Sequence, residues 1–295
     1  MSNKYIYQNK CNYCRNKNVT IDYQLKNQKL VKCSRCGLAF LNRQRIDLED
    51  LYGKDYYLKS ESNMLANYTD YRDQEKIVRQ NFRFAYNFIE NNMNQKKNVL
   101  LDVGAGFGYF IKNLPDKIVS EAVEVSAEAI AGLKINTKAR IYKGDFLKVN
   151  IKNKYDFITS YDVIEHQTDL MMYLRKIKKL LKENGMFIFT TPDFNSPINK
   201  IFGKNAPLIQ PLYHNYYLNQ KWIKQNLPSI GFRVIYLKTS YFAKSSIGNI
   251  LLLGCFAFPL LKKLKILKFA KSLKLTNITV PFIRFGGIEC ILKKM

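Results

Sequence analysis

Apolar and polar positions along the middle and end of the chain form blocks typical of alternating strands and helices. Short apolar runs predict buried strands, and stretches with apolar residues at helical spacing predict helices. The predicted strands cover residues 99–102, 118–125, 139–142, 155–161, 186–190, 233–237 and 288–292. Helices are predicted at 68–91, 126–134, 170–181 and 218–227. This order predicts an α/β fold, in which helices cover both faces of a parallel sheet.

The first predicted strand runs into Asp102 and a turn with glycine at every second position, Gly104, Gly106 and Gly108. Glycine gives such a turn backbone freedom and leaves room for a ligand beside the main chain. A dinucleotide-binding turn needs glycine at the sixth position of its motif, which is Tyr109 here, so NAD is disfavoured. A P-loop is excluded because no Gly-Lys-Ser/Thr follows. An ordinary glycine-rich turn between a strand and a helix is the alternative.

The pattern acid-x-Gly-x-Gly-x-Gly resembles the first motif of the class I S-adenosylmethionine-dependent methyltransferases. The resemblance implies a Rossmann-like sheet of seven mostly parallel strands, with S-adenosylmethionine as the cofactor. Glu124 ends the second predicted strand, about 20 residues after the first glycine, where an acid can accept hydrogen bonds from ribose hydroxyls. In these methyltransferases an acid at the place of Asp145 contacts the adenine amino group, and the next residue, here Phe146, packs on the adenine ring. The alternative for Asp145 is an acid that only stabilises a turn. The predicted cofactor site comprises Asp102, Gly104, Ala105, Gly106, Gly108, Glu124, Val125, Asp145, Phe146 and Tyr161.

After the fourth predicted strand the chain reads Asp162-Val163-Ile164-Glu165-His166. This segment looks like the D-V-x-E-H segment of the methyltransferases that act on small molecules, lipids and sugars. Two signatures of nucleic-acid methylation are missing from the sequence. No Asn/Asp-Pro-Pro-aromatic motif for base nitrogens follows this strand, and no cysteine nucleophile for base carbons lies between Cys36 and Cys255.

Methyl transfer requires a positioned acceptor, and a hydroxyl acceptor benefits from a general base. Imidazole suits proton removal near neutral pH. The only two histidines, His166 and His214, both fall in segments expected at the mouth of the active site. We predict His166, His214 and Glu165 as catalytic residues and leave open which one is the base. The alternatives are a structural partner for a backbone group at His166 and a lid or helix-entry residue at His214.

Two C-x-x-C pairs lie near the N-terminus with 18 residues between them: Cys11, Cys14, Cys33 and Cys36. Each pair can present two sulfurs to one tetrahedral ion, so the spacing predicts a four-thiolate ribbon with a structural zinc. Disulfides are disfavoured because we expect no signal peptide ahead of the pairs, and a redox dithiol is the other alternative. Cys255 and Cys290 lie in apolar runs and are expected to be inert.

A ribbon ahead of such a core resembles bacterial methyltransferases of sugar and surface-polysaccharide pathways, in which the cysteines lead into a Cys-Gly-aliphatic-x-aromatic segment and spaced tyrosines. Here Cys36 begins Cys-Gly-Leu-Ala-Phe, and Tyr52, Tyr56 and Tyr57 follow. The zinc-containing ribosomal RNA guanine methyltransferases differ, because they use a histidine and a shorter spacer. We divide the chain into a zinc ribbon (1–45), a helical cap or linker (46–95) and a methyltransferase domain (96–295).

Lysine and arginine outnumber the acids 48 to 23, which gives a net charge of +25. This charge attracts polyanions such as nucleic acid, anionic lipid or a phosphate-bearing substrate; a lysine-rich compositional habit of the source is the alternative. No acid lies between Tyr241 and Ile288, within an apolar and basic insertion predicted at 240–286. Its apolar run at 250–261 is too short to span a bilayer, which takes about 20 residues. The run either enters an anionic membrane interface or forms a buried insertion helix.

We therefore predict a cytoplasmic class I methyltransferase that acts on oxygen, ahead of nitrogen or carbon, of a small-molecule or sugar- or lipid-linked acceptor in cell-surface polysaccharide biosynthesis. Peripheral contact with the inner face of an anionic membrane stays open. The rival interpretation is an RNA methyltransferase that binds nucleic acid through the ribbon and the basic surface. A third is a binding or scaffold protein with a degenerate core, which the intact Asp102, Glu124 and Asp145 oppose.

Overall fold

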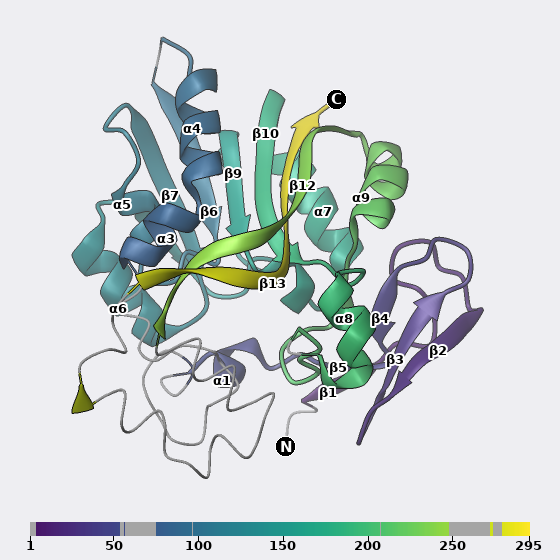
Figure 1. Cartoon of the computed structure of the whole chain (residues 1–295). Coiled ribbons are helices and arrows are strands. Elements are labelled where there is room, and N and C mark those ends of the chain that lie inside the picture. Colours follow the sequence, from purple (N-terminus) through teal and green to yellow (C-terminus); the bar gives the residue numbers. More distant parts are fainter. Residues whose placement is uncertain are drawn as a thin grey trace.

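The central element of the structure is a seven-stranded sheet in the order β12-β13-β10-β9-β6-β7-β8 (Figure 1). The computed structural model describes residues 4–53, 56, 75–95, 97–206, 208–247, 272–273 and 279–295. The strands are β6 (Asn98–Val103), β7 (Ile118–Glu124), β8 (Arg140–Lys143), β9 (Tyr155–Tyr161), β10 (Leu181–Pro192), β12 (Phe232–Ser246) and β13 (Thr279–Lys294). The pairs from β10 to β8 are parallel, and β13 is antiparallel to both of its neighbours. The predicted seven-stranded, mostly parallel α/β fold is confirmed.

Helices follow the strands in the predicted order. They are α3 (Glu75–Asn81), α4 (Arg83–Asn92), α5 (Tyr109–Lys112), α6 (Ala127–Asn136), α7 (Leu170–Leu180), α8 (Pro197–Phe202) and α9 (Gln220–Asn226), with 3-10 turns η3 (Ile164–His166), η4 (Gly203–Asn205) and η5 (Leu227–Ile230). Ser126 caps α6 and Asp169 caps α7, each accepting a hydrogen bond from a backbone N–H of the first turn. These side chains satisfy donors that a helix start leaves open. The predicted helix at 68–91 is described from Glu75 onward, where it consists of two helices separated at Phe82.

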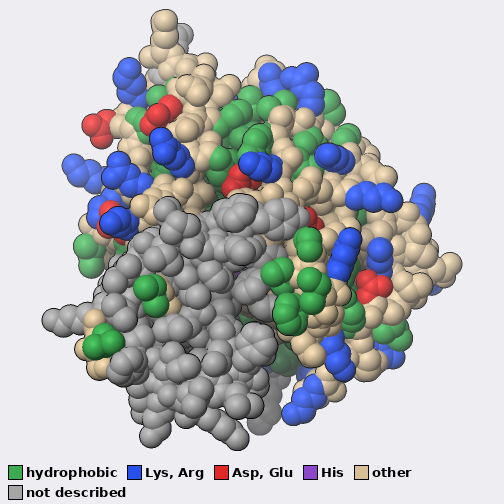
Figure 2. Space-filling model, in the orientation of Figure 1, with side chains coloured by type: hydrophobic (Ala, Val, Ile, Leu, Met, Phe, Trp, Pro, Cys, Tyr) green, Lys and Arg blue, Asp and Glu red, His purple; other side chains and the backbone are tan. Residues whose placement is uncertain are grey.

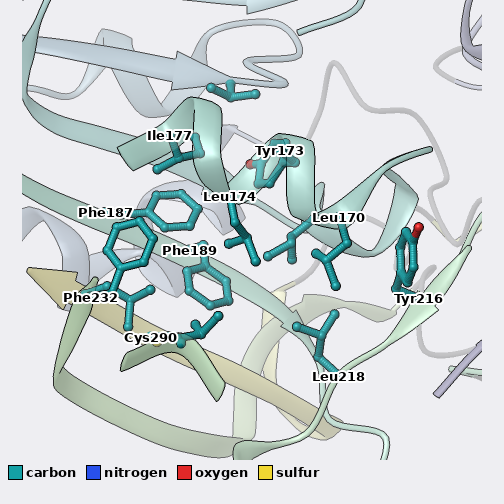
Figure 3. Packing of buried hydrophobic residues seen from close by; sticks show 14 of the residues in the cluster. Leu170, Tyr173, Leu174, Ile177, Phe187, Phe189, Tyr216, Leu218, Phe232 and Cys290 are labelled. Atoms are coloured by element: carbon teal, nitrogen blue, oxygen red, sulfur yellow. The ribbon is translucent and has the colours of Figure 1, made fainter. Parts of the chain in front are cut away.

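Successive residues of a strand point to opposite faces of the sheet, and two apolar cores follow from this alternation. On one face Phe187 and Phe189 of β10 pack with Ile177 of α7 and with Cys290 (Figure 3). On the other face Ile188 packs in a cluster that includes the apolar side of α4. Helices therefore cover both faces, as predicted, and Cys290 is a core residue.

The start of β10 differs from the predicted boundary. Helix α7 ends at Leu180, and the register between β10 and β9 shifts between Leu181 and Met186. Asn184 lies inside this irregular stretch with φ +63, in the left-handed region. The predicted helix stop at 184–185 is thus a turn within an extended segment, and regular pairing begins at Met186.

The N-terminal segment contributes strands to two small sheets, and one of these packs against the large sheet. β2 (Val19–Gln24), β3 (Lys29–Cys33) and β4 (Ala39–Leu41) form one sheet with β11 (Tyr216–Tyr217), while β1 (Tyr5–Tyr7) pairs with β5 (Arg43–Arg45) ahead of α1 (Leu48–Leu51). Phe40 of β4 lies opposite Tyr216 of β11. Both side chains are fully buried in the same apolar cluster as Phe189 of the large sheet. The N-terminal sheet and the large sheet thus share one core.

β12 and β13 form an antiparallel pair whose strands are longer than those predicted at 233–237 and 288–292. Gly287 lies opposite Pro192, the last residue of β10, so the part of β13 before it extends past the carboxyl end of that strand. Gly286 has φ +102, and a Cβ added there would lie 2.6 Å from Cβ of Ser196, so glycine is required at this point. Both ends of the predicted insertion are therefore strand, and the run at 250–261 lies outside the described residues.

Candidate functional site

The turn after β6 adopts a backbone conformation that favours glycine at three positions. The φ angle is +74 at Gly104, +55 at Gly106 and +76 at Gly108, in or near the left-handed region. The N–H groups of Gly104 and Ala105 lie 2.9 and 3.3 Å from the carbonyl oxygen of Val123. These bonds fix the turn to the end of β7, so the predicted cofactor turn lies at the carboxyl edge of the sheet.

Glu124, the last residue of β7, connects this turn to the start of α6. Its carboxylate accepts hydrogen bonds from the backbone N–H groups of Gly106 at 2.8 Å, Val125 at 2.8 Å and Ser126 at 2.9 Å. The side chain is 3 % exposed, and burial raises its pKa above the ordinary value. A carboxylate has about four acceptor positions, so Glu124 orders the turn and still has capacity for a ligand hydroxyl.

Asp102 and Tyr161 lie at the carboxyl ends of β6 and β9. Asp102 accepts a 2.7 Å hydrogen bond from Oγ1 of Thr159, and burial, together with the nearby charge of Glu124, raises its pKa to about 7. The ring of Tyr161 packs on Phe82 with 3.9 Å between centroids. Its hydroxyl is buried and has no hydrogen-bond partner among the described residues. Since such a group costs free energy, a ligand that bonds it gains affinity.

Asp145 and Phe146 follow β8 at the same edge. Oδ1 of Asp145 accepts a 2.9 Å hydrogen bond from the N–H of Leu147, which holds a tight turn. The Phe146 ring is buried edge to face against Tyr173 of α7, with 5.3 Å between centroids. Lys176 of α7 donates to the carbonyl oxygen of Phe146 at 2.5 Å. Helix α7 therefore supports this part of the predicted cofactor site.

The three predicted catalytic side chains converge beyond the carboxyl end of β9. The rings of His166 and His214 lie 4.8 Å apart, edge to face. Nδ1 of His166 lies 2.9 Å from the carbonyl oxygen of Tyr213, and Nδ1 of His214 lies 3.2 Å from that of Leu208. Nε2 of His166 lies 4.0 Å from Oε1 of Glu165. Burial lowers the pKa of both histidines, which favours neutral rings at pH 7.

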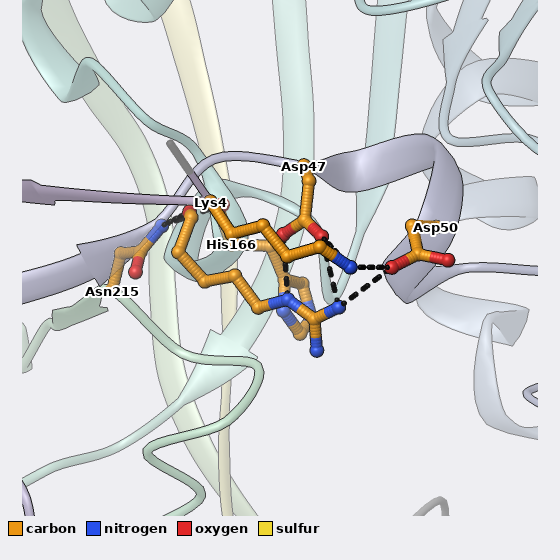
Figure 4. A network of polar contacts seen from close by, with 6 residues as sticks. Lys4, Asp47, Asp50, His166 and Asn215 are labelled. Carbon is orange, nitrogen blue, oxygen red and sulfur yellow. Dashed lines mark hydrogen bonds and ion pairs between the residues drawn. The ribbon is translucent and has the colours of Figure 1, made fainter. Parts of the chain in front are cut away.

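Asn215 connects this cluster to the N-terminal segment, beside a network of charged residues from β5 and α1 (Figure 4). Its backbone N–H donates to the carbonyl oxygen of Glu165 at 2.8 Å. Its side-chain amide nitrogen lies 3.2 Å from three carbonyl oxygens, those of Arg45, His166 and Gln167. Sequence reasoning did not single out Asn215, and its place directly after a candidate histidine was the one available signal.

Tyr52 lies between the histidine cluster and the glycine turn. Its ring is 5.7 Å from that of His166 and packs in a cluster that includes Phe107 of the turn. Burial raises the pKa of its hydroxyl, and the carboxylates of Glu165 and Glu124 both raise it further. No described residue bonds this buried hydroxyl. The sequence pointed to Tyr52 only through a family pattern, whereas the structure places it beside both parts of the site.

The Sγ atoms of the four N-terminal cysteines lie within 4.8 Å of one another, and no cysteine of the described ranges is in a disulfide: Cys11, Cys14, Cys33 and Cys36. Two of the Sγ–Sγ distances are 3.5 Å, between Cys11 and Cys36 and between Cys14 and Cys33. Arg15 and Gly37 end the two turns with φ +61 and +75, and each donates its N–H to the first cysteine of its pair at 2.9 Å. Zinc–sulfur bonds of about 2.3 Å give tetrahedral sulfur separations of about 3.8 Å. The cysteine cluster therefore fits a zinc ion.

Basic side chains line a groove between the cysteine cluster and α7: Arg35, Arg175, Lys178, Lys179 and Lys294. On the face drawn in Figure 2, Lys and Arg side chains are spread over the surface and outnumber Asp and Glu. The charge of the groove suits an anionic ligand. Among the described residues, no helix has the length and apolar character that crossing a membrane requires.

Comparison with known proteins matches the family model described as "Methyltransferase domain" to residues 73–237, more than half of the chain. Magnesium protoporphyrin IX methyltransferase from Synechocystis PCC 6803, solved with bound SAH, is similar with a TM-score of 0.50 and 12 % identity, over 83 % of this chain and 94 % of that one. The YcgJ protein of Bacillus subtilis is similar with a TM-score of 0.49 and 15 % identity, over 70 % of this chain and 96 % of that one. A possible histamine N-methyltransferase of Thermotoga maritima is similar with a TM-score of 0.48 and 16 % identity, over 76 % of this chain and 95 % of that one. A search of curated proteins found no match. At these identities, structural likeness concerns the fold alone.

Proposed function

The chain belongs to the methyltransferase-domain family and is an S-adenosylmethionine-dependent methyltransferase, and from this premise we propose that it methylates an oxygen of a small-molecule or sugar- or lipid-linked acceptor. The observation that carries the acceptor chemistry is the pair of buried imidazoles, His166 and His214, 4.8 Å apart at the carboxyl edge of the sheet. We place the reaction in cell-surface polysaccharide biosynthesis, because the cysteine pattern and the spaced tyrosines resemble enzymes of such pathways.

The residues at this edge suit S-adenosylmethionine. The left-handed glycine turn gives a ligand close access to the main chain, and Glu124 has acceptor capacity for a ribose hydroxyl. The buried hydroxyl of Tyr161 is a donor without a partner in the described ranges. We propose that these groups hold the cofactor together with Asp102, Asp145 and Phe146. When bound, the cofactor supplies an electrophilic methyl group.

A neutral imidazole at this edge supports removal of a hydroxyl proton. A carbonyl oxygen only accepts hydrogen bonds, so the carbonyl oxygens of Tyr213 and Leu208 favour the ring hydrogen on each Nδ1, which leaves Nε2 of His214 with a lone pair. His166 has a second backbone contact, with Asp162. As the sulfur–carbon bond breaks and the oxygen–carbon bond forms, the hydroxyl proton must leave. We propose that one of the two rings takes it, and that Glu165, 4.0 Å from His166, stabilises the charge that results.

Transfer of a labelled methyl group from S-adenosylmethionine to nucleotide sugars, lipid-linked sugars and RNA tests the acceptor class. We expect label in a sugar-containing acceptor, and we expect His166→Asn and His214→Asn to lower the rate by about 100-fold or more with unchanged cofactor affinity. Tyr217→Phe is the control, because it removes a buried hydroxyl from a ring whose centroid lies 6.0 Å from that of His214, and it leaves both imidazoles in place. Label in RNA and in no sugar fraction contradicts the proposal.

The basic groove favours RNA methylation as a second candidate function. Its five cations, from the N-terminal segment, α7 and β13, are suited to contacts with a phosphate backbone. Arg175→Gln then weakens retention on heparin and the yield of methylated RNA. If the wild type and Arg175→Gln elute at the same salt concentration, the groove has no such role.

We also propose that the four cysteines hold a structural zinc.

We propose further that the enzyme is cytoplasmic and that its acid-free segment makes peripheral contact with an anionic membrane. The described part of β13 before Gly287 extends past the carboxyl end of β10, where the predicted site lies. Co-sedimentation with anionic liposomes that deletion of 250–274 abolishes supports the contact. Equal sedimentation of both forms refutes it.

A further inference from the structure

The donor atoms of Glu165, His166 and His214 meet in one place. Each of the three residues offers one ligand atom, and these atoms lie within 4.8 Å of one another. Glu165 is 1 % exposed, His214 is 6 % exposed, and the His166 side chain is 12 % exposed. The cluster is therefore largely shielded from water, and the groups in it interact strongly.

The hydrogen bonds of the two rings indicate which ring nitrogen is left to bind an ion. Each Nδ1 is used by a backbone carbonyl, that of Tyr213 for His166 and that of Leu208 for His214. Nε2 of His214 is then a lone-pair donor, and His166 has a second backbone contact, with Asp162. Histidine ligands of metals show this arrangement, since they donate the second ring N–H to a carbonyl or carboxylate, which fixes the ring.

Backbone contacts hold the three residues in place from two directions. Asn215 donates its backbone N–H to the carbonyl oxygen of Glu165 at 2.8 Å, and its side chain lies 3.2 Å from the carbonyl oxygen of His166. His214 is the residue before Asn215, so one short segment positions all three side chains. Such support is what a metal site requires of the surrounding protein.

We propose that Glu165, His166 and His214 bind a divalent metal ion of the zinc type and leave a coordination position open. Two imidazoles and one carboxylate are the protein ligands of catalytic zinc sites with an open position. Bonds of about 2.0 Å place tetrahedral donors about 3.3 Å apart, so the side chains close in when the ion binds. The role of the ion rests on the proposed O-methylation and replaces the imidazole base of that proposal: the ion lowers the pKa of a coordinated acceptor hydroxyl, which releases its proton to solvent as it binds. The histidines then act as ligands.

Metal counting on the full chain tests the site. After exposure to Zn²⁺ and removal of free ion, we expect two zinc ions per wild-type chain by elemental analysis, one in the cysteine cluster and one here. His214→Ala and Glu165→Gln should each retain one, with affinity for the second weakened by about 100-fold or more. Glu121→Gln is the matched control, because Glu121 is also a buried carboxylate but bonds Tyr142 and Tyr155 on the sheet. It should retain two.

Cobalt(II) separates the two sites by spectroscopy. A thiolate-to-cobalt charge-transfer band reports an ion in the cysteine cluster. Cobalt that gives d–d bands but no charge-transfer band reports the nitrogen and oxygen site. His214→Ala should lose the second signal and keep the first. One ion per wild-type chain, held by thiolates alone, overturns the proposal even if a variant fails to fold. Neither measurement involves an acceptor, so the two proposals can fail separately. Two bound ions without methylation contradict the proposed function alone. Methylation with one thiolate-bound ion contradicts the metal site alone.

Discussion

A Cβ atom added to Gly104 would lie 2.5 Å from Cγ2 of Val163. Gly104 belongs to the turn after β6, and Val163 to the segment after β9 that leads into Glu165 and His166. The glycine turn and the segment that leads into Glu165 and His166 are therefore packed against each other at the carboxyl edge of the sheet. A change at one of them is expected to reach the other.

We expect Gly104→Ala to weaken S-adenosylmethionine binding by roughly tenfold or more and to lower the free energy of unfolding by about 1–3 kcal/mol. Alanine is strained at φ +74, and its methyl group would displace Val163. Calorimetry and urea unfolding measure the two effects. Gly203→Ala is the control, because φ is +52 there and the nearest atom to an added Cβ, in Tyr23, is 3.8 Å away. Equal loss of binding in both variants would contradict a specific role for the contact with Val163.

Glu124→Gln should reduce cofactor affinity by about tenfold or more, since an amide group presents one acceptor oxygen where the carboxylate presents two. The N–H of Gly106 and those of Val125 and Ser126 bond different carboxylate oxygens, so one side of this arrangement is lost. Calorimetry with S-adenosylmethionine gives the affinity. Glu121→Gln, on the same strand, should lower stability and leave affinity unchanged. An unaltered affinity in Glu124→Gln would remove this residue from the cofactor site.

Asp102 makes the stability of the fold depend on pH. Its pKa is about 7 in the folded protein and about 3.9 when unfolded, so the folded state binds the proton more tightly. Its contribution is fully present below pH about 4 and is lost as pH rises to about 7, a change of about 4 kcal/mol. The raised pKa of Glu124 acts in the same direction, and the lowered pKa values of the two histidines act in the opposite one below pH about 6.5.

The difference in free energy of unfolding between the wild type and Asp102→Asn isolates this effect. Asparagine retains an acceptor for the Thr159 hydroxyl and does not titrate. Urea unfolding from pH 5 to 8 should show the wild type losing stability relative to the variant up to pH about 7. Parallel stability curves would mean that the pKa of Asp102 is not raised.

Cys33→Ser should abolish zinc binding by the N-terminal cluster and lower the melting temperature, because four thiolates surround one position and zinc supplies folding free energy to such sites. Elemental analysis and thermal unfolding measure both. Cys290→Ala is the control: this cysteine is buried in the core and is not one of the four whose sulfur atoms lie together, so its loss should cost stability and leave the zinc content unchanged. Equal zinc content in the wild type and Cys33→Ser would exclude the ribbon site.

The order of strands and helices could be predicted because buried strands such as 155–161 and helices such as 170–181 have periodic apolar residues that set their type locally. The lengths of β12 and β13 could not, because the pairing of Ser246 with Thr279 joins residues far apart in the chain. The same holds for the site. The glycine turn is a local motif and could be predicted. Asn215 could not, because its partners are carbonyl groups of distant segments and no local sequence pattern marks it.

The pairing of β4 with β11 has a consequence for how such enzymes diversify. The cysteine-bearing sheet ends on two residues, Tyr216 and Tyr217, that follow His214 and Asn215 directly. An exchanged N-terminal segment would have to place a residue opposite Tyr216 as Phe40 does, or the loop carrying His214 would lose its anchor. We therefore expect chimaeras joined near residue 45 to be inactive unless both halves come from the same parent, because the cysteine-bearing sheet and the His214 loop depend on one pairing.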